Sequence, residues 1–342
     1  MKRFLLSSLL LLSLSSLSFA QPSQTPKELY EAAKAYTRQG DYDNATLVFK
    51  RLLEQDPNNA DVLKDYAFLC YLKRDYVTSI QIGKSLTEKP DADVQSFQVL
   101  GMAYKGIAET KECAKLYKKA IAKFPKSGVI YNDYGELLAG DKDMGGAIAQ
   151  WEAGIKADAG YSSNYYNASA YYAQNGNLFW TIIYGEVFVN LESYTQRTAD
   201  VKALLLDAWK KVYTTTSFPN MINKKGITSF EKTFFETLSK SNSLAAQGIT
   251  PETLSAIKTR FILDWFHDAN NEKYPFHLFE HEQYLLREGM FDAYNEWLFG
   301  TAASPSAYQV WLDNHDAEAS RFKQFQQSRV FKLPAGQYYH DK

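Results

Sequence analysis

Small and large hydrophobic positions recur along residues 26–195 with a period of 34 residues. When five windows start at residues 26, 60, 94, 128 and 162, the eighth and twentieth positions of each window carry a small or short side chain. The eighth positions are Ala33, Ala67, Gly101, Gly135 and Ser169, and the twentieth are Ala45, Ser79, Cys113, Ala147 and Thr181. The fourth positions are all large and apolar or aromatic. This spacing predicts pairs of helices that cross closely at the small residues.

The ends of these helices are also marked in the sequence. Thr25, Pro26 and Glu28 form a capping box with proline at the first helical position. Gly40, Gly140 and Gly176 fall where a first helix must end, and glycine tolerates the left-handed backbone that ends a helix. We therefore expect helix reversals at these glycines.

With this period and these positions, residues 26 to about 195 resemble the tetratricopeptide repeat (TPR) family, whose unit is a helix–turn–helix hairpin. The resemblance implies an all-α fold: a TPR-type α-solenoid of about five helix–turn–helix repeats. The fifth window departs from the pattern, because its second helix, Leu178 to Leu191, is apolar on nearly every face. A helix of that kind is covered on most sides, so we expect it to be the joint with the C-terminal part.

Residues beyond 195 show helical spacing without the repeat. Thr250-Pro251 and Ser304-Pro305 each open a helix in the sequence, the second holding Tyr308, Trp311 and Phe322. No stretch alternates as a strand would, so an α-helical C-terminal region is expected. The predicted organisation is a signal peptide over 1–20, the solenoid over 21–195 and the C-terminal helical domain over 196–342.

The first twenty residues have the pattern of a Sec signal peptide. Lys2 and Arg3 precede an apolar stretch, and Ser18 and Ala20 occupy the small positions that a signal peptidase reads. Cleavage is expected after Ala20, with an uncleaved membrane anchor as the alternative. Residue 21 is Gln, which does not fit a lipoprotein, and no later stretch is long and apolar enough to span a membrane. We expect a periplasmic or secreted protein.

The composition narrows the class of partner. A formal net charge of -1 over 342 residues argues against a nucleic-acid binder, which needs a concentrated basic face.

Cys70 and Cys113 fall in different layers of the predicted solenoid, so two buried free thiols are expected, and a disulfide is the alternative.

Few residues point to chemistry. His277 and His281 lie four residues apart with Glu280 between them, and His267 lies upstream, but the zinc-protease pattern His-Glu-x-x-His is absent. We expect no metal, no cofactor and no catalytic residues. An enzyme with a metal-dependent site at His267, His277 and His281 stays open as an alternative, as does a self-assembling envelope component.

The resemblance implies a partner-binding groove lined by the first helix of each repeat. The implied groove residues are Lys27, Tyr30, Lys34, Arg38, Lys64, Phe68, Tyr71 and Lys105. Basic residues with aromatic anchors suit an acidic protein or peptide partner. Phe68 and Tyr71 have an alternative role in packing between repeats. Some family members bind the C-terminal carboxylate of a chaperone, and they have different residues at the positions that Tyr30, Lys34 and Asp65 occupy here. A cochaperone role is therefore not expected.

We therefore expect a non-catalytic scaffold or adaptor outside the cytoplasm, which binds a partner protein or peptide in this groove. Self-association through the aromatic C-terminal helices is left open.

Overall fold

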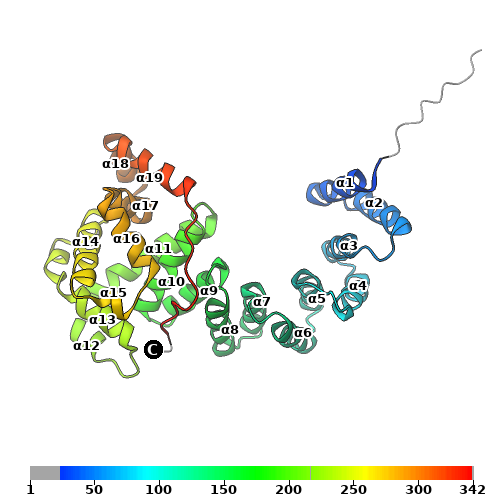
Figure 1. The fold of residues 1–342 in the computed structure, drawn as a ribbon, viewed down its shortest axis with the longest axis horizontal. Helices are drawn as coiled ribbons and strands as arrows, with labels where there is room; N and C mark the ends of the chain where they lie inside the picture. The colour runs from blue at the N-terminus through cyan, green and yellow to red at the C-terminus, as the bar shows by residue number, and fades with distance from the viewer. Residues whose placement is uncertain (1–23, 216, 341–342) are drawn as a thin grey trace, which may run out of the picture. The chain divides into compact units, whose positions relative to one another are not determined.

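The computed structural model describes residues 24–215 and 217–340, and in these ranges every regular element is helical. The expected signal peptide, residues 1–20, lies outside the described residues. The helices belong to two compact units, one ending at Gly106 and the other beginning at Ile107 (Figure 1). These units do not coincide with the predicted domain organisation, which stays a prediction.

The first unit holds five helices in the order of the repeats. They are α1 (Pro26–Gln39), α2 (Tyr42–Gln55), α3 (Ala60–Leu72), α4 (Tyr76–Glu88) and α5 (Val94–Gly106). Helices α1 and α2 pack together, as do α3 and α4, and the first helices α1, α3 and α5 lie next to one another in that order. A continuous face made of α1, α3 and α5 is the consequence.

The second unit continues the repeats and adds the C-terminal helices. Its repeat helices are α6 (Thr110–Lys123), α7 (Gly128–Gly140), α8 (Met144–Ala157), α9 (Ser162–Gln174) and α10 (Leu178–Leu191). Then follow α11 (Gln196–Thr214), α12 (Phe218–Ile222), α13 (Ser229–Ser239), a 3-10 turn (Asn242–Gln247), α14 (Pro251–His267), α15 (Asn270–Lys273), α16 (His277–Arg287), α17 (Phe291–Ala303), α18 (Pro305–Asn314) and α19 (Asp316–Ser328).

The predicted repeat register is confirmed. Helices α1, α3, α5, α7 and α9 begin at residues 26, 60, 94, 128 and 162, the first residue of each window. All ten small residues of the eighth and twentieth positions are buried. Ser79 on α4 donates a hydrogen bond of 2.8 Å to the carbonyl oxygen of Ala67 on α3, so the two backbones meet where the pattern predicted.

The turns repeat with the same period, but glycine is not required at each of them. Five residues spaced by 34 adopt positive φ at the end of the first helix of each repeat. They are Gly40, Arg74, Ala108, Lys142 and Gly176, with φ of 78°, 62°, 58°, 65° and 70°. The prediction that Gly140 would take this role was wrong, because α7 runs on through Gly140 and the left-handed residue is Lys142. The capping box at Thr25 is present as predicted.

Helix α10 is the centre of the second unit, as its apolar sequence predicted. Eleven of its residues are buried, and it packs against both α9 and α11 (Figure 1). A single hydrophobic core extends from Ala147 in α8 to Tyr339 near the end of the described chain. The last repeat and the C-terminal helices therefore share one core.

The segment after α19 has no helix and runs back past α11 and α10 towards α9 (Figure 1). Its end is fastened to the last repeats, because His340 lies 2.8 Å from the hydroxyl of Tyr172 and 3.2 Å from the carboxylate of Glu152. Tyr339 donates a hydrogen bond of 2.7 Å to the carbonyl oxygen of Pro275. This C-terminal segment, residues 329–340, therefore joins the repeats to α16.

Cys70 and Cys113 are both buried free thiols, as expected. The single helix expected from Pro305 through Phe322 is two helices, because His315 has a non-helical backbone between α18 and α19. Among the described residues, no helix combines the length and the apolar character that a membrane crossing requires.

Candidate functional site

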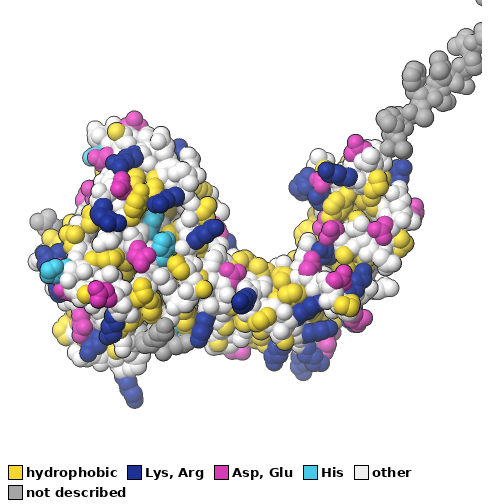
Figure 2. All heavy atoms as spheres, in the orientation of Figure 1, with side chains coloured by type: hydrophobic (Ala, Val, Ile, Leu, Met, Phe, Trp, Pro, Cys, Tyr) yellow, Lys and Arg dark blue, Asp and Glu magenta, His cyan; other side chains and the backbone are white. Residues whose placement is uncertain are grey.

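The predicted groove residues lie on α1, α3 and α5 of the first unit. Figure 2 shows that the visible surface of this unit mixes hydrophobic, basic and acidic side chains. Lys27 and Arg38 on α1 are exposed, and Lys105 on α5 is half-buried. None of these three side chains makes a hydrogen bond or an ion pair within the described part of the unit. They place positive charge without a direct ion-pair partner on α1 and α5, with Glu31 as an opposite charge near enough to act on Lys27 and Arg38.

Tyr30 joins α1 to α3 instead of standing free. Its hydroxyl donates a hydrogen bond of 2.6 Å to the carboxylate of Asp65. Burial, and then this hydrogen bond, raise the pKa of Tyr30 above its ordinary range, so the phenol stays neutral. The ammonium of Lys34 lies 4.7 Å from the Tyr30 ring centre and 2.7 Å from the carboxylate of Glu31. Tyr30 and Lys34 thus form a half-buried pair on the face.

Lys64 differs from the other predicted groove cations. It is only 6% exposed, and its Nζ lies 2.6 Å from Asp93 and 2.9 Å from Asp61. Burial acts to lower the pKa of Lys64, but the hydrogen bonds to Asp93 and Asp61 outweigh it and the pKa is raised. Its charge is therefore already balanced by two carboxylates, and it orders the junction of α3 with the start of α5.

The two predicted aromatic anchors stack on each other. The ring centres of Phe68 and Tyr71 lie 6.2 Å apart, and Tyr76 at the start of α4 continues the row at 5.9 Å from Tyr71. All three side chains are half-buried. The row therefore serves packing within the repeat and still presents aromatic surface.

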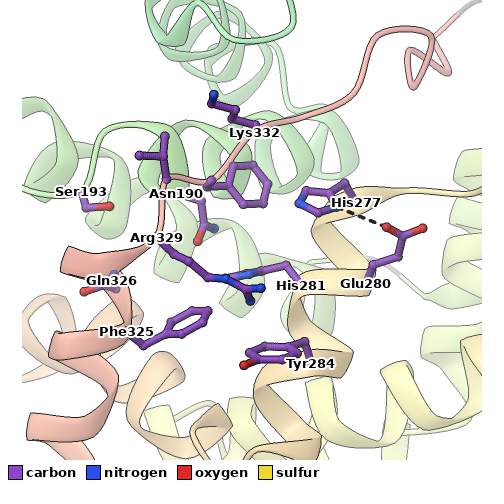
Figure 3. A pocket seen from close by; sticks show the side chains of 12 residues that line it. Asn190, Ser193, His277, Glu280, His281, Tyr284, Phe325, Gln326, Arg329 and Lys332 are labelled. Atoms are coloured by element: carbon purple, nitrogen blue, oxygen red, sulfur yellow. Dashed lines mark hydrogen bonds and ion pairs between the residues drawn. The ribbon is translucent and has the colours of Figure 1, made fainter.

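A second candidate site lies in the other unit, where His277 and His281 line a pocket of about 450 Å³ (Figure 3). His267 does not line it and is exposed at the end of α14. The structure therefore does not bring the three histidines of the enzyme alternative together. Over the described ranges, no three His, Cys, Asp or Glu side chains are grouped so that they could hold a metal ion.

A buried charged network lies beneath this pocket. Lys258 of α14 contacts the carboxylate of Glu186 on α10 and lies 2.8 Å from that of Glu282 on α16. Tyr294 of α17 donates a hydrogen bond of 2.8 Å to Glu186, and Asn190, which lines the pocket, donates one of 2.9 Å to the Tyr294 hydroxyl. The network ties four helices together.

The protonation of this network follows from its charges. Burial acts to raise the pKa of Glu186, but Lys258 and the hydrogen bonds hold the pKa below its ordinary value. Burial raises the pKa of Glu282 well above its ordinary value, and the charge of Glu186 adds to this effect. Of the two carboxyl groups, Glu282 therefore holds a proton more strongly, and Glu186 is the one that carries negative charge opposite Lys258. The sequence analysis did not identify this charged network. Its one indication in the sequence was Glu186, a single acidic residue in the apolar run of α10.

Comparison with known proteins gives one family and several similar structures. The model of the tetratricopeptide repeat matches residues 26–69. The human tetratricopeptide repeat protein 21B is 28% identical over 120 residues, which cover 34% of this chain and 9% of that protein. The match thus spans less than a tenth of the relative's length.

The similar solved structures include a thermophilic TPR protein of Thermus thermophilus, 15% identical, with a TM-score of 0.43 over 54% of this chain and 99% of that one. YrrB, described as a TPR protein with an unusual peptide-binding site, is 16% identical, with a TM-score of 0.36 over 52% of this chain and 92% of that one. A tetratricopeptide repeat protein from Parabacteroides merdae is 13% identical, with a TM-score of 0.41 over 72% and 92%.

Proposed function

We propose that this chain, whose residues 26–69 match the tetratricopeptide repeat model, is a non-catalytic scaffold that holds an acidic peptide segment of a partner protein on the α1–α3–α5 face. The proposal includes a location outside the cytoplasm, in the periplasm or secreted. The pattern of residues 1–20 supports that location.

The observation that carries the proposal is the set of unpaired cations next to stacked aromatic rings. Lys27, Arg38 and Lys105 have no ion-pair partner among the residues described, while Phe68 and Tyr71 offer half-buried aromatic surface. An acidic peptide would supply the missing charge, and its apolar side chains would pack on the rings. Lys64 contributes order rather than charge, since two carboxylates already pair with it.

Peptide arrays test this function directly. The mature chain is probed with acidic peptides that contain Leu or Phe, and with the same peptides in which Lys replaces Asp and Glu. We expect the acidic series to bind, and an Arg38→Glu/Phe68→Ala variant to lose at least about tenfold in affinity. Arg51→Glu on α2 makes the same change of charge off this face and should bind like the wild type. Full affinity in the double variant would remove the face from consideration.

The location needs a separate measurement. Expression in a bacterial host followed by N-terminal sequencing of the exported fraction should give a mature chain that starts at Gln21. Retention of the full chain inside the cell would contradict the location without affecting the binding face. Light scattering of the purified chain tests self-assembly, the remaining alternative from the sequence.

A further inference from the structure

The pocket of Figure 3 is assembled from parts of the chain that are distant in sequence. Asn190 comes from the end of α10 and Ser193 from the turn after it, His277 to Tyr284 come from α16, and Phe325 and Gln326 from α19. The C-terminal segment closes it with residues 329–332. A volume of about 450 Å³ falls in the range of pockets that take small organic ligands. The pocket is therefore assembled by the fold, because its walls come from three helices and an extended segment.

Arg329 is the strongest charge in the pocket. Its guanidinium lies 4.9 Å from the ring centre of Tyr284 and 5.6 Å from that of Phe325. No carboxylate of the described chain pairs with it. Figure 3 shows the side chain reaching over Tyr284 towards His281. Guanidinium is always charged at neutral pH and binds carboxylates through two parallel hydrogen bonds. A planar cation is therefore held in place by rings and left without its usual partner.

His281 adds a second donor. Burial, and then the neighbouring His277, lower the pKa of His281 to about 4, so the ring is neutral at physiological pH and carries one N–H. Neither of its ring nitrogens makes a hydrogen bond in the part of the chain that the structure covers. Its ring packs on Phe325 at 5.8 Å and on Phe331 at 5.4 Å. The imidazole is thus fixed in orientation but has unused hydrogen-bonding capacity.

The one acidic residue of the pocket is already engaged. Glu280 lies 3.2 Å from Nδ1 of His277, on the side of the pocket away from Arg329. The side-chain amide of Asn190 donates to Tyr294 and to the carbonyl oxygen of Glu186. Figure 2 shows imidazole side chains with Lys and Arg side chains around them on this face of the unit. The charge that the pocket lacks is negative.

We propose that this pocket binds a small aromatic carboxylic acid, whose carboxylate pairs with Arg329 and whose ring packs against Phe331 and Tyr284. The aromatic walls favour a flat apolar body, since rings in contact prefer stacked or edge-to-face geometry. One guanidinium and one imidazole N–H match a single carboxylate. Lys332 also lines the pocket, but Figure 3 shows its side chain directed away from Arg329 and His281. This site is separate from the proposed binding face of the first unit.

Calorimetry with a matched pair of probes tests the proposal on the full-length protein. N-acetylphenylalanine and N-acetylphenylalanine amide share the same ring and differ in the carboxylate. We expect the acid to bind at least about tenfold more tightly than the amide, and Arg329→Gln to remove that difference. Arg321→Gln, on α19 and paired with Glu288 on the surface, should leave binding unchanged. Equal binding of the two probes, or no measurable binding of the acid at millimolar concentration, overturns the proposal.

A second readout comes from the histidines. A carboxylate placed between Arg329 and His281 should raise the pKa of His281 from about 4. In the protein without a ligand, His277, Arg329 and Lys258 lower this pKa, and Glu186 raises it. The NMR signals of its ring protons, followed from pH 3 to 8, measure that shift. A shift in wild type that Arg329→Gln abolishes supports the site. The same shift with inorganic phosphate at equal concentration shows a site for any anion and overturns the aromatic acid as ligand.

Discussion

The hydroxyl of Ser79 donates a hydrogen bond of 2.8 Å to the carbonyl oxygen of Ala67, across the crossing of α3 and α4. Both residues are fully buried, so the two backbones approach as closely as side chains of this size permit. In the other repeats the corresponding positions are also small and buried. The stability of the repeats therefore depends on residues that contribute almost no volume.

Gly135 should be the most sensitive of these positions to added volume. A Cβ atom there would lie 2.5 Å from Cδ1 and 2.9 Å from Cε2 of the buried Trp151. We expect Gly135→Ala to destabilise the second unit by about 1 to 3 kcal/mol in urea unfolding. Gly140→Ala, in the same helix with open space around it, should be neutral or stabilise by up to about 1 kcal/mol. Equal effects would contradict this account of the crossing.

At Lys142 we expect a substitution by glycine to stabilise the protein. The backbone of this residue has φ of 65°, a conformation in which glycine is favoured. We expect Lys142→Gly to raise the free energy of unfolding by up to about 1 kcal/mol. Lys126→Gly, in an exposed turn without positive φ, is the control and should not stabilise. Thermal unfolding followed by circular dichroism compares the two variants, and a lower midpoint for Lys142→Gly would count against the turn assignment.

Removal of Lys258 should be costly, because it leaves Glu186 buried without its cation. We expect Lys258→Met to lose about 3 to 5 kcal/mol of stability, the usual range for one partner of a buried pair. Lys211→Met breaks an exposed pair with Asp207 and should cost less than about 1 kcal/mol. Urea unfolding at pH 7 measures both, and similar losses would show that the buried network is not what joins the helices.

The ionisation of Glu296 should make the free energy of unfolding depend on pH. The side chain is 5% exposed, and burial, together with the charges of Glu252 and Asp292, raises its pKa from 4.5 to about 7. Between those values the folded protein keeps a proton that the unfolded chain releases, so stability falls as pH rises from about 4.5 to 7.

We expect Glu296→Gln to reduce this fall and to be the more stable form at pH 8. The difference should be on the order of 1 kcal/mol, because the carboxylate lines a solvent-accessible pocket. Glu318→Gln changes an exposed residue of the same pocket and serves as the control. Urea unfolding at pH 5 and pH 8 makes the comparison, and a parallel pH dependence in wild type and Glu296→Gln would exclude Glu296 as its source.

The sequence predicted the parts of the fold that depend on local periodicity. The starts of α1, α3, α5, α7 and α9, the cap at Thr25 and the central position of α10 were all readable, because each follows from side-chain size or polarity at fixed spacing. The turn at Lys142 was not, since lysine has no preference for positive φ and Gly140 lay two residues away.

The sites depended on contacts that spacing does not encode. Lys64 looked like a groove cation, and only the positions of Asp61 and Asp93 show that its charge is balanced. Arg329 and His281 meet because the C-terminal segment returns over α16, a relation between distant residues that no periodic pattern predicts. The same holds for Lys258 and Glu186, which are 72 residues apart.

The return of the C-terminal segment sets an order of events during synthesis. Tyr172 cannot meet His340 until 168 further positions have been translated, which takes roughly 10 to 30 seconds at ordinary elongation rates. Until then, Tyr172 on α9 and Trp180 on α10 lack the His340 ring that packs against both. For an exported chain, such a delay would keep the unit open while the nascent polypeptide meets the secretion machinery, which accepts unfolded substrates.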